Sequence, residues 1–230
     1  MAYNDQELNQ LSYKLALKYD TRTYCEYYLS LIKTKHNLIF DFYYNKDYNI
    51  RIVKIDLFFV GFVIYYVVNA LFYNDDTMHK FYEYKGQYHF IYQLPKIVYS
   101  SLISSVINTL LKLLALSEND ILDFKKNKKT ENLQKRTIEL NNKLKTKFVL
   151  YYIISTIIIL FFWYYISMFC STYRNTQIHL IKDTLVSFTL SLFYPFCIYL
   201  LPGFFRIPAL SNKRNKREYL YTISKLFQLI

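Results

Sequence analysis

One uncharged stretch, FVLYYIISTIIILFFWYYISMFCSTY, extends from Phe148 to Tyr173. Because an α-helix rises about 1.5 Å per residue, this run is long enough to cross a hydrocarbon core about 30 Å thick. A helix buried in a soluble core is seldom so long or so evenly apolar around its circumference. The stretch therefore predicts a transmembrane helix, and every other segment has to be placed relative to a bilayer.

Three further apolar segments are long enough to form membrane-spanning helices, and polar connections separate them. We expect these helices at residues 53–73, 90–116 and 184–205, with the uncharged stretch as the third span. The fold class that this pattern predicts is all-α: a polytopic membrane protein with four transmembrane helices and a helical segment at its N-terminus.

Particular residues refine the limits of the second and fourth spans. Lys96 and Lys112 flank the uncharged centre of the second span, and we expect both side chains to extend outward to the headgroups. Pro195 predicts a kink inside the fourth span, and Pro202 and Pro208 predict its end. We expect no ionisable residue deep inside any span, which disfavours a transport pathway.

The chain carries 29 Lys and Arg residues against 17 Asp and Glu residues, a formal net charge of +12. In a soluble protein this excess would first suggest nucleic acid as a partner. Here the basic residues alternate in blocks with the apolar runs, which is typical of a membrane protein, so we expect the lipid bilayer as partner and no nucleic acid. The three cysteines are scattered and form no CxxC pair, which predicts neither a disulfide framework nor a zinc site.

The distribution of basic residues predicts the topology. Most of them lie in residues 1–52, 117–147 and 206–230, and few lie in the other two connections. The positive-inside rule therefore places both termini and the middle loop in the cytosol. The chain is then a first hairpin (53–116) and a second hairpin (148–205) joined by a basic cytosolic loop, in the plasma membrane or an endomembrane.

Both ends of the chain are expected to be helical. In the N-terminal segment, Asp20-Thr21 predicts the cap of a helix that lies either in the membrane interface or in a small hairpin packed on the rest. The tail combines a basic cluster with apolar residues at helical spacing, which predicts an amphipathic helix docked on the membrane. The residues expected to bind lipid headgroups are Lys213, Arg214, Lys216 and Arg217.

The best candidate for a metal or catalytic site is DDTMHKFYE, in which Asp75, His79 and Glu83 would share one face of a helix. His179 and Asp183, on the same side of the membrane, are the only residues that could complete a coordination set. A solvated connection explains these residues better, because no second cluster of ligands accompanies them. We therefore expect no enzyme, no cofactor and no metal ligands, with a membrane enzyme built on this segment as a weaker option.

Small and hydrogen-bonding residues in two spans are candidates for contact between helices, since hydrophobic burial cannot drive association within lipid. In the second span these are Ser101, Ser104, Ser105 and Asn108, and in the fourth they are Ser187 and Ser191. Spans one and three are instead rich in Phe, Tyr, Ile and Val. We expect spans two and four to pack at the centre, with spans one and three at the periphery.

Five stretches are distinctive enough for comparison: TYCEYYLSLIKTKHNLIF, VNALFYNDDTMHKFY, FIYQLPKIVYSSLISSVIN, NTQIHLIKDTLVSFTLSLFYPF and LPGFFRIPAL. They resemble a family of uncharacterised multi-pass membrane proteins from ciliate-like protists, and the resemblance covers the chain from about Tyr24 to the tail. That family brings no established activity.

A second resemblance rests on the element Asn69-Ala70-Leu71-Phe72, the Ser-rich second span and the pair Ser187-Phe188. These are similar to the membrane helices that precede the channel domain of the polycystin family. The sequence departs from that family because it shows no channel domain, no PLAT domain and no large extracellular region. The resemblance implies an accessory membrane module, a part of a larger receptor-like protein, without an ion pathway of its own.

From these observations we expect a non-enzymatic integral membrane module that acts in structure or in partner binding. Its partners would be other membrane proteins or further copies of the chain. The alternative is a subunit of an oligomeric channel or transporter, whose pore would be built from polar faces such as Ser101, Ser104 and Asn108.

Overall fold

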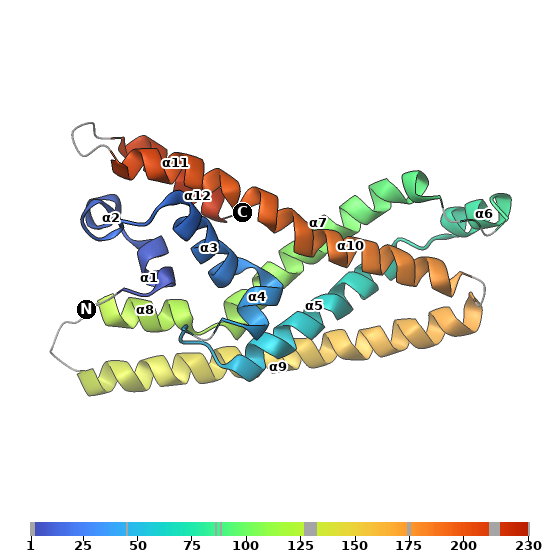
Figure 1. Ribbon diagram of the computed structural model, residues 1–230. Helices are drawn as coiled ribbons and strands as arrows, with labels where there is room; N and C mark the ends of the chain where they lie inside the picture. Colours follow the sequence, from blue (N-terminus) through green and yellow to red (C-terminus); the bar gives the residue numbers. More distant parts are fainter. Residues whose placement is uncertain are drawn as a thin grey trace. The chain divides into compact units, whose positions relative to one another are not determined.

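The computed structural model describes residues 3–44, 46–85, 87, 89–126, 133–173, 176–211 and 217–229, and these ranges contain helices and no strands (Figure 1). Four segments are long and apolar enough to cross a membrane: Arg51–Leu71, Phe90–Ala115, Leu133–Thr172 and Gln177–Ser211. The predicted all-α class and the presence of four such segments are confirmed.

The chain divides into two compact units. The central unit comprises Asn49–Ser191, and the terminal unit combines Met1–Tyr48 with Leu192–Ile230. The helices of the central unit are α5 (Arg51–Leu71), α6 (Asp75–Glu83), α7 (Phe90–Ala115), α8 (Glu118–Lys126), α9 (Leu133–Thr172) and the first part of α10 (Gln177–Ile198). The terminal unit contains α1 (Asp5–Gln10), α2 (Tyr13–Tyr19), α3 (Tyr24–Lys35), α4 (Asn37–Phe42), the end of α10, α11 (Leu200–Ser211) and α12 (Glu218–Leu229).

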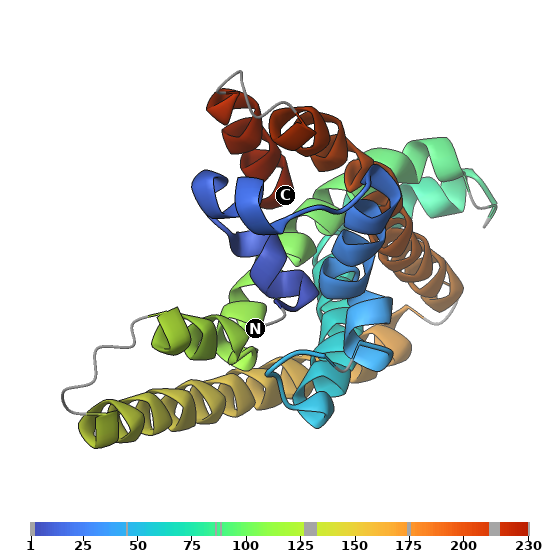
Figure 2. The ribbon, with the colours of Figure 1, turned by 60° about the vertical axis from the view of Figure 1, so that its left-hand side comes forward.

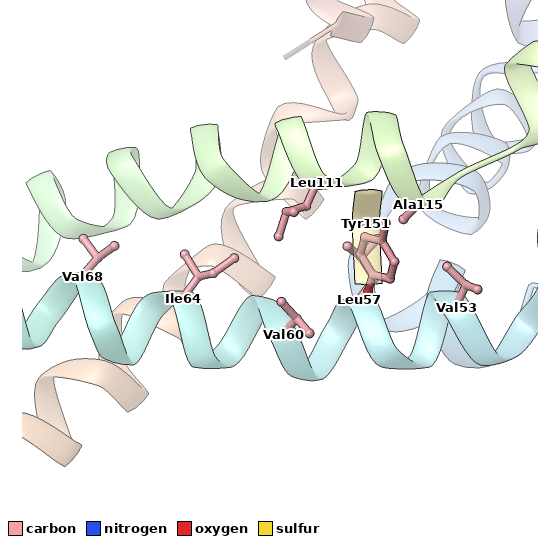
Figure 3. Close-up of a cluster of buried hydrophobic side chains, with 8 residues drawn as sticks. All are labelled: Val53, Leu57, Val60, Ile64, Val68, Leu111, Ala115 and Tyr151. Atoms are coloured by element: carbon pink, nitrogen blue, oxygen red, sulfur yellow. The ribbon is translucent and has the colours of Figure 1, made fainter. Parts of the chain in front are cut away.

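The first span, α5, is the most buried of the four. In its most apolar 18 residues 56% are buried, against 22% for α7, 11% for α9 and 28% for the span made of α10 and α11. Its inward face carries aliphatic residues at helical spacing, opposite residues of α7 and α9 (Figure 3). The cluster consists of Val53, Leu57, Val60, Ile64, Val68, Leu111, Ala115 and Tyr151.

The prediction that spans two and four form the centre is therefore wrong. It weighed polar residues and overlooked the side of α5 that carries no bulky aromatic ring. On that side Gly61 lets α7 approach closely, since a Cβ added there would lie 3.2 Å from Oδ1 of Asn108. A helix with small and aliphatic residues along one face packs well without polar contacts.

The third span extends far beyond the uncharged stretch. At 40 residues, α9 is about 60 Å long, roughly twice the thickness of a hydrocarbon core. Its charged first part and α8 occupy much of the predicted loop 117–147, which is therefore more helical than expected (Figure 2). Asp120 of α8 forms ion pairs with Lys143 and Lys147, each at 2.6 Å, so α8 is fastened to the beginning of α9.

The fourth span is interrupted at Tyr199 and continues through the prolines that were expected to end it. Helix α10 contains Pro195 and stops at Ile198, and α11 contains Pro202 and Pro208. Pro202 lies in the first turn of α11, where a backbone N–H would have no partner inside the helix, so proline is tolerated there. The prediction that these residues terminate the helical segment is wrong.

In the terminal unit, side chains of the N-terminal helices bind backbone carbonyls of the last span. The hydroxyl of Tyr24 donates to the Leu200 carbonyl at 2.9 Å, and that of Tyr28 donates to the Phe196 carbonyl at 3.1 Å. His36 Nε2 lies 2.7 Å from the Leu192 carbonyl oxygen. These acceptors are spaced four residues apart, so they follow one face of the helical segment.

The start of α3 differs from the expected cap at Asp20-Thr21. Thr23 is the N-cap residue, and it forms a capping box with Glu26. Asp20 cannot serve as the cap, because its carboxylate binds the side chains of Arg22 and Arg206.

The tail helix α12 packs on protein through much of its apolar face. Tyr221 donates to the Leu11 carbonyl at 2.7 Å, and the ring of Phe227 stacks on that of Phe205 with centroids 5.5 Å apart. Tyr221 and Phe227 therefore contact protein, whereas Leu226 of the same helix is 59% exposed, and the docking of the tail on the membrane stays a prediction. Of the four headgroup candidates, Lys213, Arg214 and Lys216 lie outside the described residues. Arg217, directly before α12, is partly exposed, and its contact with lipid stays a prediction.

The two glycines of the helices provide a matched test of this packing. A Cβ at Gly203 would lie 2.6 Å from Cε2 of Tyr24, whose ring is fixed by its hydrogen bond to Leu200. We expect Gly203→Ala to lower the free energy of unfolding in detergent by about 1–3 kcal/mol through overpacking. Gly61→Ala should change it by less than about 1 kcal/mol, because the amide of Asn108 can turn aside. Equal losses in the two variants would contradict this packing.

Candidate functional site

A single asparagine connects three helices inside the central unit. Asn69 of α5 is fully buried, and its side-chain nitrogen donates to the Ser187 hydroxyl of α10 at 2.8 Å. The Ser100 hydroxyl of α7 donates to Asn69 Oδ1, also at 2.8 Å. The same nitrogen donates to the Tyr65 carbonyl of its own helix at 2.8 Å. Asn69 therefore satisfies both of its polar atoms within protein, as a side chain surrounded by hydrocarbon requires.

An ion pair lies on the same faces of α7 and α10. Lys96 Nζ is 3.0 Å from Asp183 Oδ2, and the side chains are 11% and 0% exposed. The hydroxyl of Tyr73, just after α5, donates to the same carboxylate oxygen at 2.7 Å. The expectation that Lys96 extends outward is wrong in this structure, because its ammonium group finds a carboxylate inside the unit.

Aromatic rings surround this ammonium group. Lys96 Nζ lies 3.8 Å from the ring centroid of Tyr73 and 5.8 Å from that of Phe81 in α6, both within the range of cation–π attraction. The Phe81 ring stacks on His179 with centroids 4.4 Å apart and an interplanar angle of 16°. We call Tyr73, Phe81 and Asp183 the ammonium cage.

The sequence-predicted packing residues have different surroundings in the structure. Ser104, Ser187 and Ser191 are buried, whereas Ser101, Ser105 and Asn108 are partly exposed. Ser187 joins α10 to α5 through its hydrogen bond with Asn69, whereas the Ser191 hydroxyl donates to the Phe188 carbonyl of its own helix at 2.6 Å. The Ser104 hydroxyl is buried and has no hydrogen-bond partner among the described residues.

The ion pair was missed from the sequence although a signal was present. His179, Asp183, Ser187 and Ser191 repeat every four residues and so form one polar stripe along a helix. We expected the fourth span to begin at residue 184, whereas α10 begins at Gln177. That error placed Asp183 in the polar connection before the span, where water would solvate its carboxylate and no protein partner would be needed.

The residues of the predicted metal site do not converge. Asp75, Asp76, His79 and Glu83 are all exposed on α6. His179 and Asp183 are buried against Phe81 and Lys96. Within the part of the chain that the structure describes, no group of three or more His, Cys, Asp or Glu residues could hold a metal ion.

The terminal unit contains a second buried ion pair. Arg206 is fully buried, and its Nη2 donates to Asp20 Oδ2 at 2.7 Å and to the Leu8 carbonyl at 2.8 Å. Its guanidinium lies between the rings of Tyr27 and Tyr221, with centroid distances of 4.9 and 4.8 Å. These contacts join the beginning of the chain, α3, α11 and α12.

Two arginines act on the Asp20 carboxylate. Arg22 Nε donates to Asp20 Oδ1 at 2.8 Å, beside the contacts from Arg206. Burial disfavours the charged form of Asp20, but the hydrogen bonds and positive charges of Arg22 and Arg206 outweigh it and hold the pKa of Asp20 below its ordinary value of 3.8.

Comparison of the chain with known protein families, with curated proteins and with solved structures finds no match. The role of the site is therefore argued from the contacts of its own residues. The Asn69 network fixes three helices, and the Lys96–Asp183 pair places one positive and one negative charge among aromatic rings.

Replacing Asn69 should weaken the contact between three helices. Asn69→Ala removes two hydrogen bonds between helices, and such bonds are individually modest, so we expect a loss of about 1–2 kcal/mol of unfolding free energy. Ser191→Ala is the matched control, because the Ser191 hydroxyl donates within α10. Unfolding in detergent, followed by circular dichroism, compares the two. A loss in the control as large as in Asn69→Ala would contradict a joining role for Asn69.

The Asp20 cluster should make the stability of the terminal unit depend on acid. Because the folded pKa of Asp20 lies below 3.8, its contribution is complete above that value and is lost as the pH falls through the folded pKa. Asp20→Asn leaves Arg206 buried without its charge partner, which should cost about 3–5 kcal/mol near neutral pH. Unfolding measured from about pH 6 to about pH 2 should show this difference shrinking. A constant difference over that range would contradict the assignment.

Proposed function

We propose that the chain is a non-enzymatic integral membrane module that binds other membrane proteins or further copies of itself. The observation that supports this most directly is the contrast between the spans. Polar groups of α5, α7 and α10 bind one another. In α9, by contrast, only 11% of the most apolar 18 residues are buried. Helix α9 thus presents a broad face, including the large side chains of Trp163 and Tyr164, to lipid or to a partner, while its opposite face packs on α5 and α7.

The proposed topology has both termini in the cytosol, in the plasma membrane or an endomembrane. Two observations support it: the basic residues flank the spans on one side, and both ends of the chain belong to one compact unit. An even number of spans agrees with this arrangement in two hairpins. The resemblance to the helices that precede the polycystin channel domain fits a module of a larger receptor-like protein.

The second candidate function is a subunit of an oligomeric channel or transporter. The buried Lys96–Asp183 pair favours it, because ionisable residues inside membrane spans commonly mark ion or substrate pathways. The partly exposed polar residues of α7, such as Ser101 and Asn108, would line a pore only after association of several copies.

Flux through liposomes separates the two functions. For the module we expect purified chain in liposomes to give no ion or solute flux above protein-free vesicles, because its polar groups bind one another. Flux that is lost on Asn108→Leu would instead establish the channel. The module itself predicts that Trp163→Ala weakens association with copies or partners without lowering the unfolding midpoint, whereas the same change at the buried Phe169 should lower that midpoint.

Topology is tested with single cysteines in a chain whose Cys25, Cys170 and Cys197 have been replaced. A cysteine at Ile138, which is exposed on α9, should react with a membrane-impermeant reagent only after the cytosolic side is opened. A cysteine at Tyr82, exposed on α6, should react from the opposite side. Reaction of both from one side would contradict the two-hairpin arrangement.

A further inference from the structure

The ammonium cage has the composition of a site for a positively charged ligand. The carboxylate of Asp183 lies 3.0 Å from Lys96 Nζ, and the ring of Tyr73 lies 3.8 Å from it. A carboxylate combined with aromatic faces is how proteins recognise organic ammonium ions. The group seated there in this structure is itself a primary ammonium ion on an alkyl chain, supplied by the protein.

The cage is fixed, whereas its occupant is movable. Asp183 is fully buried and is held by the hydroxyl of Tyr73, which packs edge-on against Phe169 at 5.4 Å. Lys96 lies within two turns of the start of α7 at Phe90, and a lysine close to the end of a span can extend its four-carbon stem toward the headgroups. The headgroup region thus offers the side chain an alternative to the cage.

We propose that the ammonium cage is a binding site for a small primary alkylammonium ion, and that Lys96 is a tethered occupant that the ligand displaces. This inference goes beyond the proposed module function and does not depend on it. A displaced Lys96 extends to the headgroups, so the net charge inside the unit is unchanged when the ligand enters. The cost of burying the new cation is therefore offset by the departure of the old one.

The chemistry of the cage favours an alkylammonium ion over a metal cation. Calcium and magnesium ions need several oxygen ligands, whereas the three side chains of the cage offer one carboxylate, the tyrosine hydroxyl bound to it and two aromatic rings.

The test uses the purified full chain in detergent and n-butylammonium chloride, whose cation matches the Lys96 side chain. Lys96→Ala removes the tethered ammonium group from the cage, so n-butylammonium should raise the unfolding midpoint in a saturable manner. n-Butanol, of the same shape and without charge, should not. The double variant Lys96→Ala, Asp183→Asn should lose the response, because the carboxylate partner is gone. An equal response in the double variant, or none in Lys96→Ala, overturns the proposal.

The wild-type chain gives an independent measurement that does not need the variant to fold. Because Lys96 occupies the cage most of the time, half-saturation by n-butylammonium should require about tenfold more ligand than in Lys96→Ala. n-Butylammonium should increase acetylation of Lys96 relative to sodium at equal ionic strength, and because the free amine consumes the reagent equally for every lysine, the ratio between two lysines is measured. Acetylation of Lys182, exposed on α10, is the internal control. An unchanged ratio of Lys96 to Lys182 acetylation overturns displacement.

Discussion

A polar side chain surrounded by hydrocarbon is stabilised by partners within the protein, and two such arrangements hold the helices of the central unit together. Asn69 binds one side chain from each of two neighbouring helices and a carbonyl of its own. The Lys96–Asp183 pair combines opposite charges with a tyrosine hydroxyl. These contacts are directional, unlike the aliphatic packing of α5 against α7 and α9, so they determine which faces of α7 and α10 point inward.

In the terminal unit the polar groups that need partners are backbone carbonyls of the last span, and side chains of neighbouring helices donate to them. A helix interrupted at Tyr199 and carrying several prolines lacks part of its regular hydrogen bonding. Tyr24, Tyr28 and Ser224 donate to carbonyls on either side of this interruption. The N-terminal and C-terminal segments are thereby held against the last span, and the Asp20–Arg206 pair adds a charged contact between the N-terminal segment and that span.

The sequence was sufficient to predict features that depend only on the order of apolar and polar residues along the chain. The uncharged run from Phe148 and three other apolar segments predicted four spans, and all four are present as helices of adequate length. It was insufficient for which helix lies at the centre, because that depends on shape: Gly61 and the valines of α5 make a smooth face that hydropathy does not distinguish from a lipid-facing one. Lys96 was misplaced for a similar reason. A lysine near a span end can extend to the headgroups or bind a group inside the protein, and only the three-dimensional position of Asp183 shows that Lys96 does the latter.

The length of α9 has a mechanical consequence. The helix is described without interruption from Leu133 to Thr172, so its membrane part and its charged part behave as one rod (Figures 1 and 2). The charged part, residues 133–147, is about 22 Å long, and a change of about 10° in tilt would carry its far end sideways by about 4 Å. Since α8 is fastened to this part through Asp120, it would move with the rod. Tilting of the apolar part of α9 would therefore be converted into a sideways displacement of its charged part and of α8.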